Sequence, residues 1–311
     1  MRHRKRHRKF RHQYQTHENG KGRVLLVGNP NVGKSVIFTY LTGRYAIASN
    51  YPGTTVEVSR GVMGPREGRE VVDTPGVNSL FPRSEDEKVT RDIILADPDA
   101  TVVQVADAKN LFRALLLTSQ LAEIGCRMIL VLNMMDEARQ RGFDIDTGQL
   151  SEQLGIEVIE AVAVEKVGLP RLAAAISEER AEVPSIAVGY SPRLVEAVRE
   201  IQRDLGEENP FGMFGALSMM TGNDDVFSRK KGPNLKQALK KLDTIRERFF
   251  EPPGYTIAGA RKEWAEKLMS GSVMVEGADS GEGGRGLWRY APSAVTGAVT
   301  VALYLLLGRQ G

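Results

Sequence analysis

Cysteine is almost absent from this chain of 311 residues, which contains only Cys126. A single cysteine has no partner within the chain, so an internal disulfide is excluded and a reducing compartment is favoured. Charged residues make up 26% of the chain and hydrophobic residues 41%, proportions typical of a globular protein. The length predicts about two domains.

Long apolar runs are also scarce. The longest stretch without a charged side chain, residues 290–308, has nineteen residues, and crossing a bilayer takes roughly 20. We expect a transmembrane helix within residues 287–311, with a membrane-surface or buried terminal helix as the alternative. A single span cannot form a pore unaided. Five glycines within residues 276–286 predict a flexible linker before it.

The first 22 residues hold almost no apolar side chains and are expected to be a disordered basic tail. The net charge of +3 divides into +8 over residues 1–23 and −5 over the remainder. All four histidines lie in this tail: His3, His7, His12 and His17. A transition-metal tether and a solvated arm attracted to anionic lipid or RNA are the two interpretations, and we favour the second. No apolar core follows the charges, so the tail is not a secretory signal.

What the sequence does contain is a glycine-rich loop, Gly28–Ser35, that matches the pattern G-x-x-x-x-G-K-[ST]. It follows the apolar run Val24–Val27, and a strand, a loop and a helix in this order form a phosphate-binding loop. Lys34 would supply a charge to the β- and γ-phosphates, and the Ser35 hydroxyl would bind Mg²⁺. The expected nucleotide-binding residues of this loop are Asn29, Asn31, Val32, Gly33, Lys34 and Ser35.

Two further predicted strands end in polar residues. One ends at Asp73, which is expected to hold the metal through water, and the N–H of Gly76 would meet the γ-phosphate. Another ends at Asn133, with Asp136 three residues later. A carboxylate in that place accepts hydrogen bonds from N1–H and the 2-amino group of guanine, and adenine presents neither donor. Since each charge-assisted hydrogen bond contributes about 1.5–3 kcal/mol, Asp136 would select guanine.

These elements occur in the order of a GTPase, each at the end of a predicted strand, and they predict a protein that binds GTP and GDP with Mg²⁺. Residues 49–57 contain proline and glycine and predict a mobile loop that closes on the metal and the γ-phosphate. Thr54 and Thr55 compete for the role of its metal ligand. Residues 84–88 are polar and suit a second switch.

Apolar strands alternate with helical patterns from residue 23 to residue 180, which predicts an α/β fold with a mostly parallel sheet covered by helices on both faces. All the motifs of this G domain would lie at the carboxyl ends of strands. The expected strands are 23–28, 56–63, 69–73, 100–106, 127–133 and 156–162. The expected helices are 35–43, 87–96, 110–124 and 168–180.

The composition changes after residue 180. Residues 181–192 contain Pro184, Gly189 and Pro192, which predict a linker. Helical periodicity then returns in three segments: 191–206, 234–250 and 256–270. We expect residues 181–275 to form a small helical domain, with a plain bundle that only covers the G domain as the alternative.

Together these motifs resemble FeoB, the family of bacterial ferrous-iron transporters. The resemblance rests on five segments, which read GNPNVGKS (28–35), NYPGTTVE (50–57), DTPG (73–76), SEDEKVTRD (84–92) and NMMDEA (133–138). It is close from about Arg23 to Arg180 and continues weakly to about Val275. It implies a P-loop GTPase domain followed by a helical regulatory domain that favours the GDP state.

The resemblance also implies roles for single residues. In this family the switch threonine stands directly before Val-Glu, which selects Thr55 as the Mg²⁺ ligand beside Ser35 and Asp73. Asn31 matches the loop asparagine that helps to hold K⁺ in potassium-activated members, so K⁺ is a candidate cofactor. Val77 stands where Ras-like proteins have a catalytic glutamine, and a valine cannot orient water, so turnover is expected to be slow.

The segment near the last strand usually reads Ser-Ala in this family and reads Ala161-Val162-Ala163 here. The N–H of Ala163 would reach the guanine oxygen, without the support of a serine side chain. The residues expected to act in catalysis are Lys34, Thr55 and Gly76.

The function implied is a GTP-binding, slowly hydrolysing switch that regulates ferrous-iron transport at the cytoplasmic face of the inner (plasma) membrane. A polytopic iron permease domain or subunit would be its partner, and nucleic acid is not expected to be one. Because no further apolar span follows, we expect a truncated relative or one part of a split system. The alternatives are a soluble ribosome- or RNA-associated GTPase and a non-catalytic, nucleotide-gated interaction module.

Overall fold

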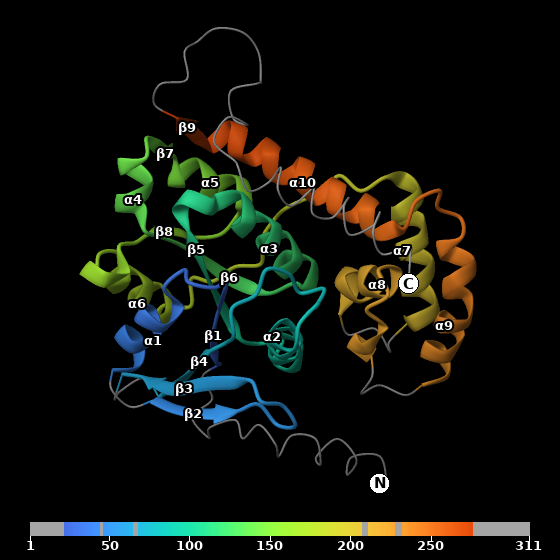
Figure 1. The fold of residues 1–311 in the computed structure, drawn as a ribbon, viewed down its shortest axis with the longest axis horizontal. Helices are drawn as coiled ribbons and strands as arrows, with labels where there is room; N and C mark the ends of the chain where they lie inside the picture. Colours follow the sequence, from blue (N-terminus) through green and yellow to red (C-terminus); the bar gives the residue numbers. More distant parts are fainter. Residues whose placement is uncertain (1–21, 44–45, 65–67, 207–210, 228–231, 276–311) are drawn as a thin grey trace, which may run out of the picture. The chain divides into compact units, whose positions relative to one another are not determined.

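The computed structural model describes residues 22–43, 46–64, 68–206, 211–227 and 232–275. A seven-stranded sheet of order β2-β3-β4-β1-β5-β6-β8 lies at its centre, with helices on both faces (Figure 1). The strands are β1 (Val24–Gly28), β2 (Ala46–Asn50), β3 (Glu57–Met63), β4 (Arg69–Asp73), β5 (Thr101–Asp107), β6 (Arg127–Asn133) and β8 (Val158–Glu160). Two short strands, β7 (Phe143–Ile145) and β9 (Val273–Val275), pair separately.

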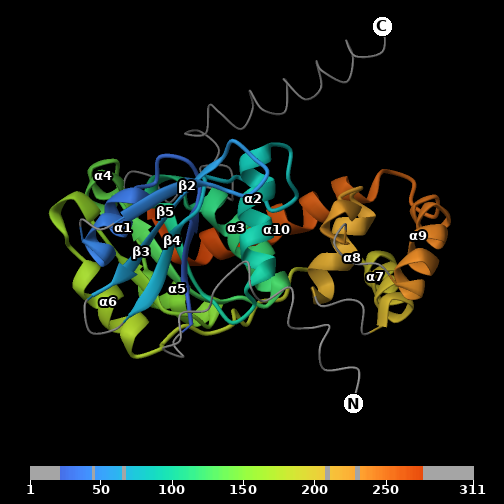
Figure 2. The same cartoon turned by 90° about the horizontal axis from the view of Figure 1, so that it is seen from below.

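Ten α-helices and three 3₁₀ turns of the described residues surround these strands. The helices are α1 (Lys34–Thr42), α2 (Glu85–Ala96), α3 (Leu111–Ile124), α4 (Met135–Gln140), α5 (Thr147–Leu154), α6 (Leu169–Ser177), α7 (Pro192–Leu205), α8 (Gly212–Met220), α9 (Pro233–Arg246) and α10 (Pro253–Ser272). The 3₁₀ turns are η1 (Ala108–Asn110), η2 (Ala163–Glu165) and η4 (Asp224–Phe227). Figure 2 shows α7, α8 and α9 grouped beyond α2 and α3, away from the sheet.

The sheet is mostly parallel. Strand β1 pairs in parallel with β4 and β5, β5 with β6, and β6 with β8. The antiparallel pairs are at one edge, where β3 joins β4 and β2 joins β3. Because the carboxyl ends of parallel strands meet at one edge of a sheet, the segments that follow β1, β4, β5 and β6 converge there. Asp107 and Asn133, for example, are direct neighbours at the ends of β5 and β6.

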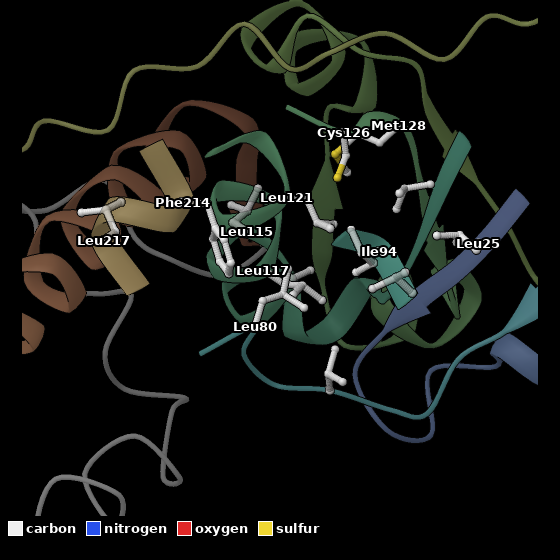
Figure 3. Close-up of a cluster of buried hydrophobic side chains, with 14 of the residues drawn as sticks. Leu25, Leu80, Ile94, Leu115, Leu117, Leu121, Cys126, Met128, Phe214 and Leu217 are labelled. Atoms are coloured by element: carbon white, nitrogen blue, oxygen red, sulfur yellow. The ribbon is translucent and has the colours of Figure 1, made fainter. Parts of the chain in front are cut away.

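Each face of the sheet has its own hydrophobic core. Helices α1 and α6 cover one face through side chains such as Ile37 and Leu172. Helices α2, α3 and α5 cover the other, and the same core continues into α7, α8, α9 and α10. Figure 3 shows that continuity: Phe214 of α8 lies beside Leu115 of α3, in the same cluster. The helical segment therefore packs directly on the G domain, and residues up to Met274 form one compact unit.

Local sequence explains how the elements near the site begin. Ser84 is the N-cap of α2, because its hydroxyl accepts a hydrogen bond from the N–H of Glu87 at 3.3 Å. The Glu87 carboxylate in turn accepts from the N–H groups of Arg83 and Asn78, so this side chain holds the loop that precedes α2. Gly168 precedes α6 with φ +79°, where a Cβ would come within 2.0 Å of the carbonyl oxygen of Glu160.

The predicted fold class is confirmed. Every predicted strand and helix is present within a few residues of its expected bounds. Six α-helices and strands were missed, namely β2, β7, β9, α4, α5 and α8. Residues 181–191 contain neither helix nor strand, although Ala181 is buried and Glu182 bridges to Met128.

None of the helices among the described residues is long and apolar enough to cross a membrane. The transmembrane helix predicted within residues 287–311, the linker 276–286 and the basic tail before Gly22 lie outside the described residues.

Candidate functional site

The glycine-rich loop has the predicted context, because β1 ends at Gly28 and α1 begins at Lys34. Two of its glycines are required by close contacts. A Cβ on Gly28 would lie 2.1 Å from the carbonyl oxygen of Val105 in the neighbouring strand. Gly33 has φ +91°, and a Cβ there would lie 2.4 Å from the side-chain nitrogen of Asn133. The loop is thus held tightly between β5 and the end of β6.

Lys34 points its ammonium group back into the loop. Its Nζ donates to the carbonyl oxygens of Gly28 at 3.4 Å and Asn29 at 3.3 Å. Burial lowers the pKa of Lys34, while the nearby Asp73 carboxylate raises it in opposition. A buried ammonium that has only long hydrogen bonds to carbonyl oxygens would gain from a bound anion such as a phosphate.

Asp73 and Ser35 form an oxygen-rich pair beside this lysine. The Ser35 hydroxyl donates to Asp73 Oδ2 at 2.7 Å. Burial raises the pKa of Asp73, against the opposing effects of the Ser35 hydrogen bond and of Lys34. The other oxygen, Oδ1, is buried and has no hydrogen-bond partner among the described residues. An unpaired carboxylate oxygen beside a hydroxyl fits a hard cation such as Mg²⁺, which binds oxygen ligands.

The segment that follows β4 lies against the glycine-rich loop. Thr74 donates to the carbonyl oxygen of Leu26 through its N–H at 3.2 Å and its hydroxyl at 2.8 Å. The N–H of Val77 donates to the oxygen of Gly28 at 3.0 Å. A Cβ on Gly76 would lie 2.8 Å from the Cα of Pro30, so glycine is required for this approach. Val77 itself is fully buried, and its side chain faces the core rather than the site.

Asn133 connects the loop to the segment after β8. Its Nδ2 donates to the carbonyl oxygen of Val32 at 2.9 Å, and its Oδ1 accepts from the N–H of Ala163 at 2.8 Å. Asn133 is buried. The amide of Ala163, which the sequence assigned to the guanine oxygen, is therefore already hydrogen-bonded to Asn133 in this structure.

Asp136 lies in the first turn of α4 and is partly exposed. The turn before it is unusual, because Met134 adopts the left-handed conformation with φ +62°. The N–H of Met135 donates to the carbonyl oxygen of Ala161 at 3.2 Å, which ties the turn to the end of β8.

The two threonines of the predicted mobile loop have different surroundings. Thr54 is engaged within the loop, since its hydroxyl donates to the carbonyl oxygen of Tyr51 at 2.9 Å and accepts from the N–H of Val56 at 3.2 Å. Thr55 is exposed. Asn31 is also exposed and has φ +63°. The structure thus joins the loop, Asp73, Gly76, Asn133 and Ala163 by close contacts. Asn31 lies in the same loop but is exposed, Thr55 is exposed, and Asp136 is partly exposed.

Residues 22–176 match the family model described as ferrous iron transport protein B. This chain carries a FeoB N-terminal domain. The FeoB proteins of Legionella pneumophila (strain Paris) and Salmonella typhimurium (strain LT2) are respectively 31% and 32% identical to it over 234 and 246 residues. These alignments cover 71% and 76% of this chain but only 31% and 32% of the relatives. The chain therefore spans about a third of the length of the curated relatives it matches.

Solved structures agree with this assignment. The cytosolic domain of L. pneumophila FeoB has a TM-score of 0.72 and 29% identity, covering 81% of this chain and 99% of that one. A mutant NFeoB of S. thermophilus bound to GDP has a TM-score of 0.71 and 27% identity, covering 81% of this chain and all of that one. The predicted P-loop GTPase fold is confirmed by this likeness.

The FeoB N-terminal domain of this chain also contains site contacts that the sequence did not predict. Asn29 Nδ2 donates to the carbonyl oxygen of Val77 and to Asn78 Oδ1, both at 3.1 Å. The Thr90 hydroxyl of α2 donates to the carbonyl oxygen of Pro75 at 3.1 Å. Each of these contacts joins residues far apart in sequence, and the sequence carries no local signal for any of them.

Proposed function

We propose that this FeoB N-terminal domain binds GTP and GDP with Mg²⁺, hydrolyses GTP slowly and regulates ferrous-iron transport by a polytopic permease domain or subunit. The observation that carries the proposal is the buried, unpaired oxygen of Asp73 beside the Ser35 hydroxyl and the Lys34 ammonium. A metal–phosphate pair satisfies all three groups at once, because the cation takes the oxygens and the anion takes the ammonium.

Each candidate residue has its own proposed role in binding the phosphates or the metal. Lys34 binds the β- and γ-phosphates, and the backbone N–H groups of Asn29 and of residues 31–33 surround them. Ser35, Thr55 and Asp73 would hold Mg²⁺, directly or through water. When bound, the metal neutralises charge on the phosphate oxygens. Gly76, pressed against Pro30, offers its N–H to the γ-phosphate.

Slow hydrolysis follows from the position of Val77. Its side chain is fully buried and its N–H is bonded to Gly28, so it offers no group to orient the attacking water. The water would instead rely on backbone groups and on charge near the phosphates. Asn31 is the residue we assign to K⁺, on its place in the loop. Single-turnover hydrolysis compared in K⁺ and Na⁺ tests this assignment, and equal rates in the two salts would remove it.

Guanine selection is assigned to Asp136, with Asn133 holding the two loops that flank the base. A guanine nucleotide as the ligand is supported by the S. thermophilus NFeoB mutant, whose structure is a complex with GDP. The location proposed is the cytoplasmic face of the inner membrane, because the L. pneumophila structure is of a cytosolic domain. Asp136 is partly exposed, as a carboxylate that contacts a ligand must be.

Calorimetry on the full chain with Mg²⁺ tests the proposal. GDP should bind and ADP should not. Asp136→Asn should weaken GDP by roughly tens- to hundreds-fold, the size of one or two charge-assisted hydrogen bonds, and should favour xanthosine diphosphate. Asp144→Asn, at an exposed carboxylate of β7, is the matched control and should change neither affinity. Absence of heat with GDP would overturn the proposed function. Binding without single-turnover hydrolysis would leave only a nucleotide-gated interaction module.

A further inference from the structure

Lys109, in the turn η1 that follows strand β5, lies beside the proposed base-binding turn. Strand β5 ends at Asp107, next to Asn133 of β6 in the sheet register. The turn η1 follows at once and lies against α4. Asp107 fixes this turn with both carboxylate oxygens, because it accepts from the N–H of Lys109 at 3.0 Å and from the side chain of Asn110 at 2.7 Å. The direction in which Lys109 leaves the sheet is therefore set by the fold.

The Lys109 ammonium reaches the start of α4. It forms an ion pair with Glu137, lies 3.5 Å from the sulfur of Met134 and 3.6 Å from Asp107 Oδ1. Its side chain is only 10% exposed. Met134, directly after Asn133, carries no charge of its own. The positive charge beside Met134 is thus supplied by Lys109 of η1.

The first turn of α4 needs such support. The helix has six residues, too few to be stable without tertiary contacts. Met134 has φ +62°, a left-handed conformation that is unfavourable for a residue with a side chain. The N–H of Met135 is held by Ala161 on one side. On the other side, Lys109 contacts Met134 and Glu137, the residues that bracket Met135 and Asp136.

We propose that Lys109 is a positioning residue for guanine selection, which holds the carboxylate of Asp136 in the orientation that accepts both N1–H and the 2-amino group. The inference rests on the proposed function. Hypoxanthine keeps N1–H but lacks the 2-amino group. If the turn is less rigid, the Asp136 carboxylate can still accept one hydrogen bond from N1–H but no longer holds the orientation that accepts two. The affinity for guanine nucleotides should therefore fall more than the affinity for hypoxanthine nucleotides.

The test is the affinity of the full chain for GDP and for inosine diphosphate, measured by calorimetry with Mg²⁺. Lys109→Met should weaken GDP about tenfold and inosine diphosphate much less, so the preference for guanine falls. Lys109→Arg keeps the charge and should retain most of the preference. Arg113→Met removes an exposed cation of α3 and should leave both affinities unchanged.

Glu137→Gln provides a second measurement that does not depend on the folding of Lys109→Met. It weakens the same ion pair and should lower the guanine preference in the same direction. The inference is overturned if both variants keep the parent's preference for GDP over inosine diphosphate, or if both nucleotides are weakened equally. GDP binding by the parent chain would still support the proposed function in that case. A parent chain that binds no GDP overturns both.

Discussion

At the scale of single residues, the site holds charges in surroundings that disfavour them. Burial lowers the pKa of Lys34 and raises the pKa of Asp73, and in both cases it is the largest cause. The opposite charges of Lys34 and Asp73 stabilise each other in part, but the pKa shift of each group still favours its neutral form. Without a ligand these groups reduce the stability of the fold, and binding a metal and phosphates would relieve that cost.

Asp73→Asn should therefore stabilise the nucleotide-free protein at neutral pH. The folded-state pKa of Asp73 lies above its ordinary value of 3.8, so the folded chain binds the proton more tightly than the unfolded chain. The wild type then loses stability as the pH rises from 3.8 through the folded-state pKa. Thermal unfolding without nucleotide should give the variant the higher Tm at pH 7, with the difference shrinking as the pH falls toward 3.8.

The same substitution removes a proposed metal ligand, so Mg²⁺-dependent GDP binding should be lost while the apo protein gains stability. Asp144→Asn, at an exposed position, should shift neither quantity. A variant that is less stable than the wild type at pH 7 would contradict the view that desolvation dominates at Asp73.

Asn133 should contribute to stability as well as to binding. It is buried and satisfies both the carbonyl oxygen of Val32 and the N–H of Ala163. Asn133→Ala leaves two buried backbone groups unpaired, at about 1–3 kcal/mol each. Denaturant unfolding without nucleotide should show a loss of roughly 2–5 kcal/mol. A loss below about 1 kcal/mol would mean that water replaces the side chain.

At the scale of elements, α2 connects the site to the helical segment. Thr90 holds the carbonyl oxygen of Pro75, two residues after Asp73. The next residue, Arg91, is 1% exposed and donates to both carboxylate oxygens of Asp225 in η4 at 2.9 and 3.0 Å. The hydrogen bonds from Arg91 lower the pKa of Asp225. A shift of the segment after β4 on nucleotide exchange would therefore be felt in η4.

A double-mutant cycle with Arg91→Met and Asp225→Asn measures this link. Because the Asp225 side chain is 37% exposed, solvent screening limits the coupling energy to about 1 kcal/mol in denaturant unfolding. The double variant should also release a fluorescent GDP analogue at a rate different from the wild type. The Lys88 side chain is 51% exposed, and its ammonium lies 3.3 Å from Asp225. Lys88→Met is therefore the control and should couple to Asp225→Asn more weakly. Additive effects of the two substitutions would show that α2 and η4 are independent.

The elements that could be predicted from the sequence are those with a local signal. Strands β1 and β6 contain long apolar runs, and α7 has a clear apolar face. Helix α8 was missed because Phe214 to Met220 are all buried, so no polar face marks its period. Strand β2 was missed because the pairing with β3, and not its own sequence AIASN, makes it a strand.

The positions of the candidate site residues could be predicted for the same reason, wherever those residues belong to a continuous sequence motif. The loop, Asp73, Gly76 and Asn133 were placed at strand ends, where the structure has them. The contact of Asn29 with Val77 and that of Lys109 with Glu137 join segments that follow different strands. Such contacts depend on strand order and register, which a sequence pattern does not specify.

At the scale of the whole molecule, one buried cluster joins the G domain to the helical segment. Arg261 of α10 forms an ion pair with Glu123 of α3, and the hydroxyl of Tyr190 donates to the same carboxylate. The guanidinium of Arg261 also lies 4.5 Å from the ring centroid of Phe81. That ring stacks on Phe214 of α8 at 5.2 Å. The loop after β4 is thereby enclosed by two helices of the helical segment.

This cluster predicts that the sheet and the helical segment unfold together. Trp264 reports on α10, in a Trp288→Phe background that removes the second tryptophan, and far-UV circular dichroism reports on the whole chain. The two thermal transitions should coincide, and GDP at 100 times its Kd should stabilise both by about 2.7 kcal/mol.

Arg261→Met should separate the Trp264 transition from the circular dichroism transition. The Arg261 and Glu123 side chains are 5% and 6% exposed, so the substitution leaves a buried carboxylate without its cation, at a cost of about 3–5 kcal/mol. The Trp264 transition should then move to a lower temperature than the circular dichroism transition. Lys267→Met, at an exposed position of the same helix, should leave the two transitions together. If Arg261→Met also leaves them together with an unchanged midpoint, the hydrophobic core shared by α3, α8 and α10 is sufficient to couple the two parts without the ion pair.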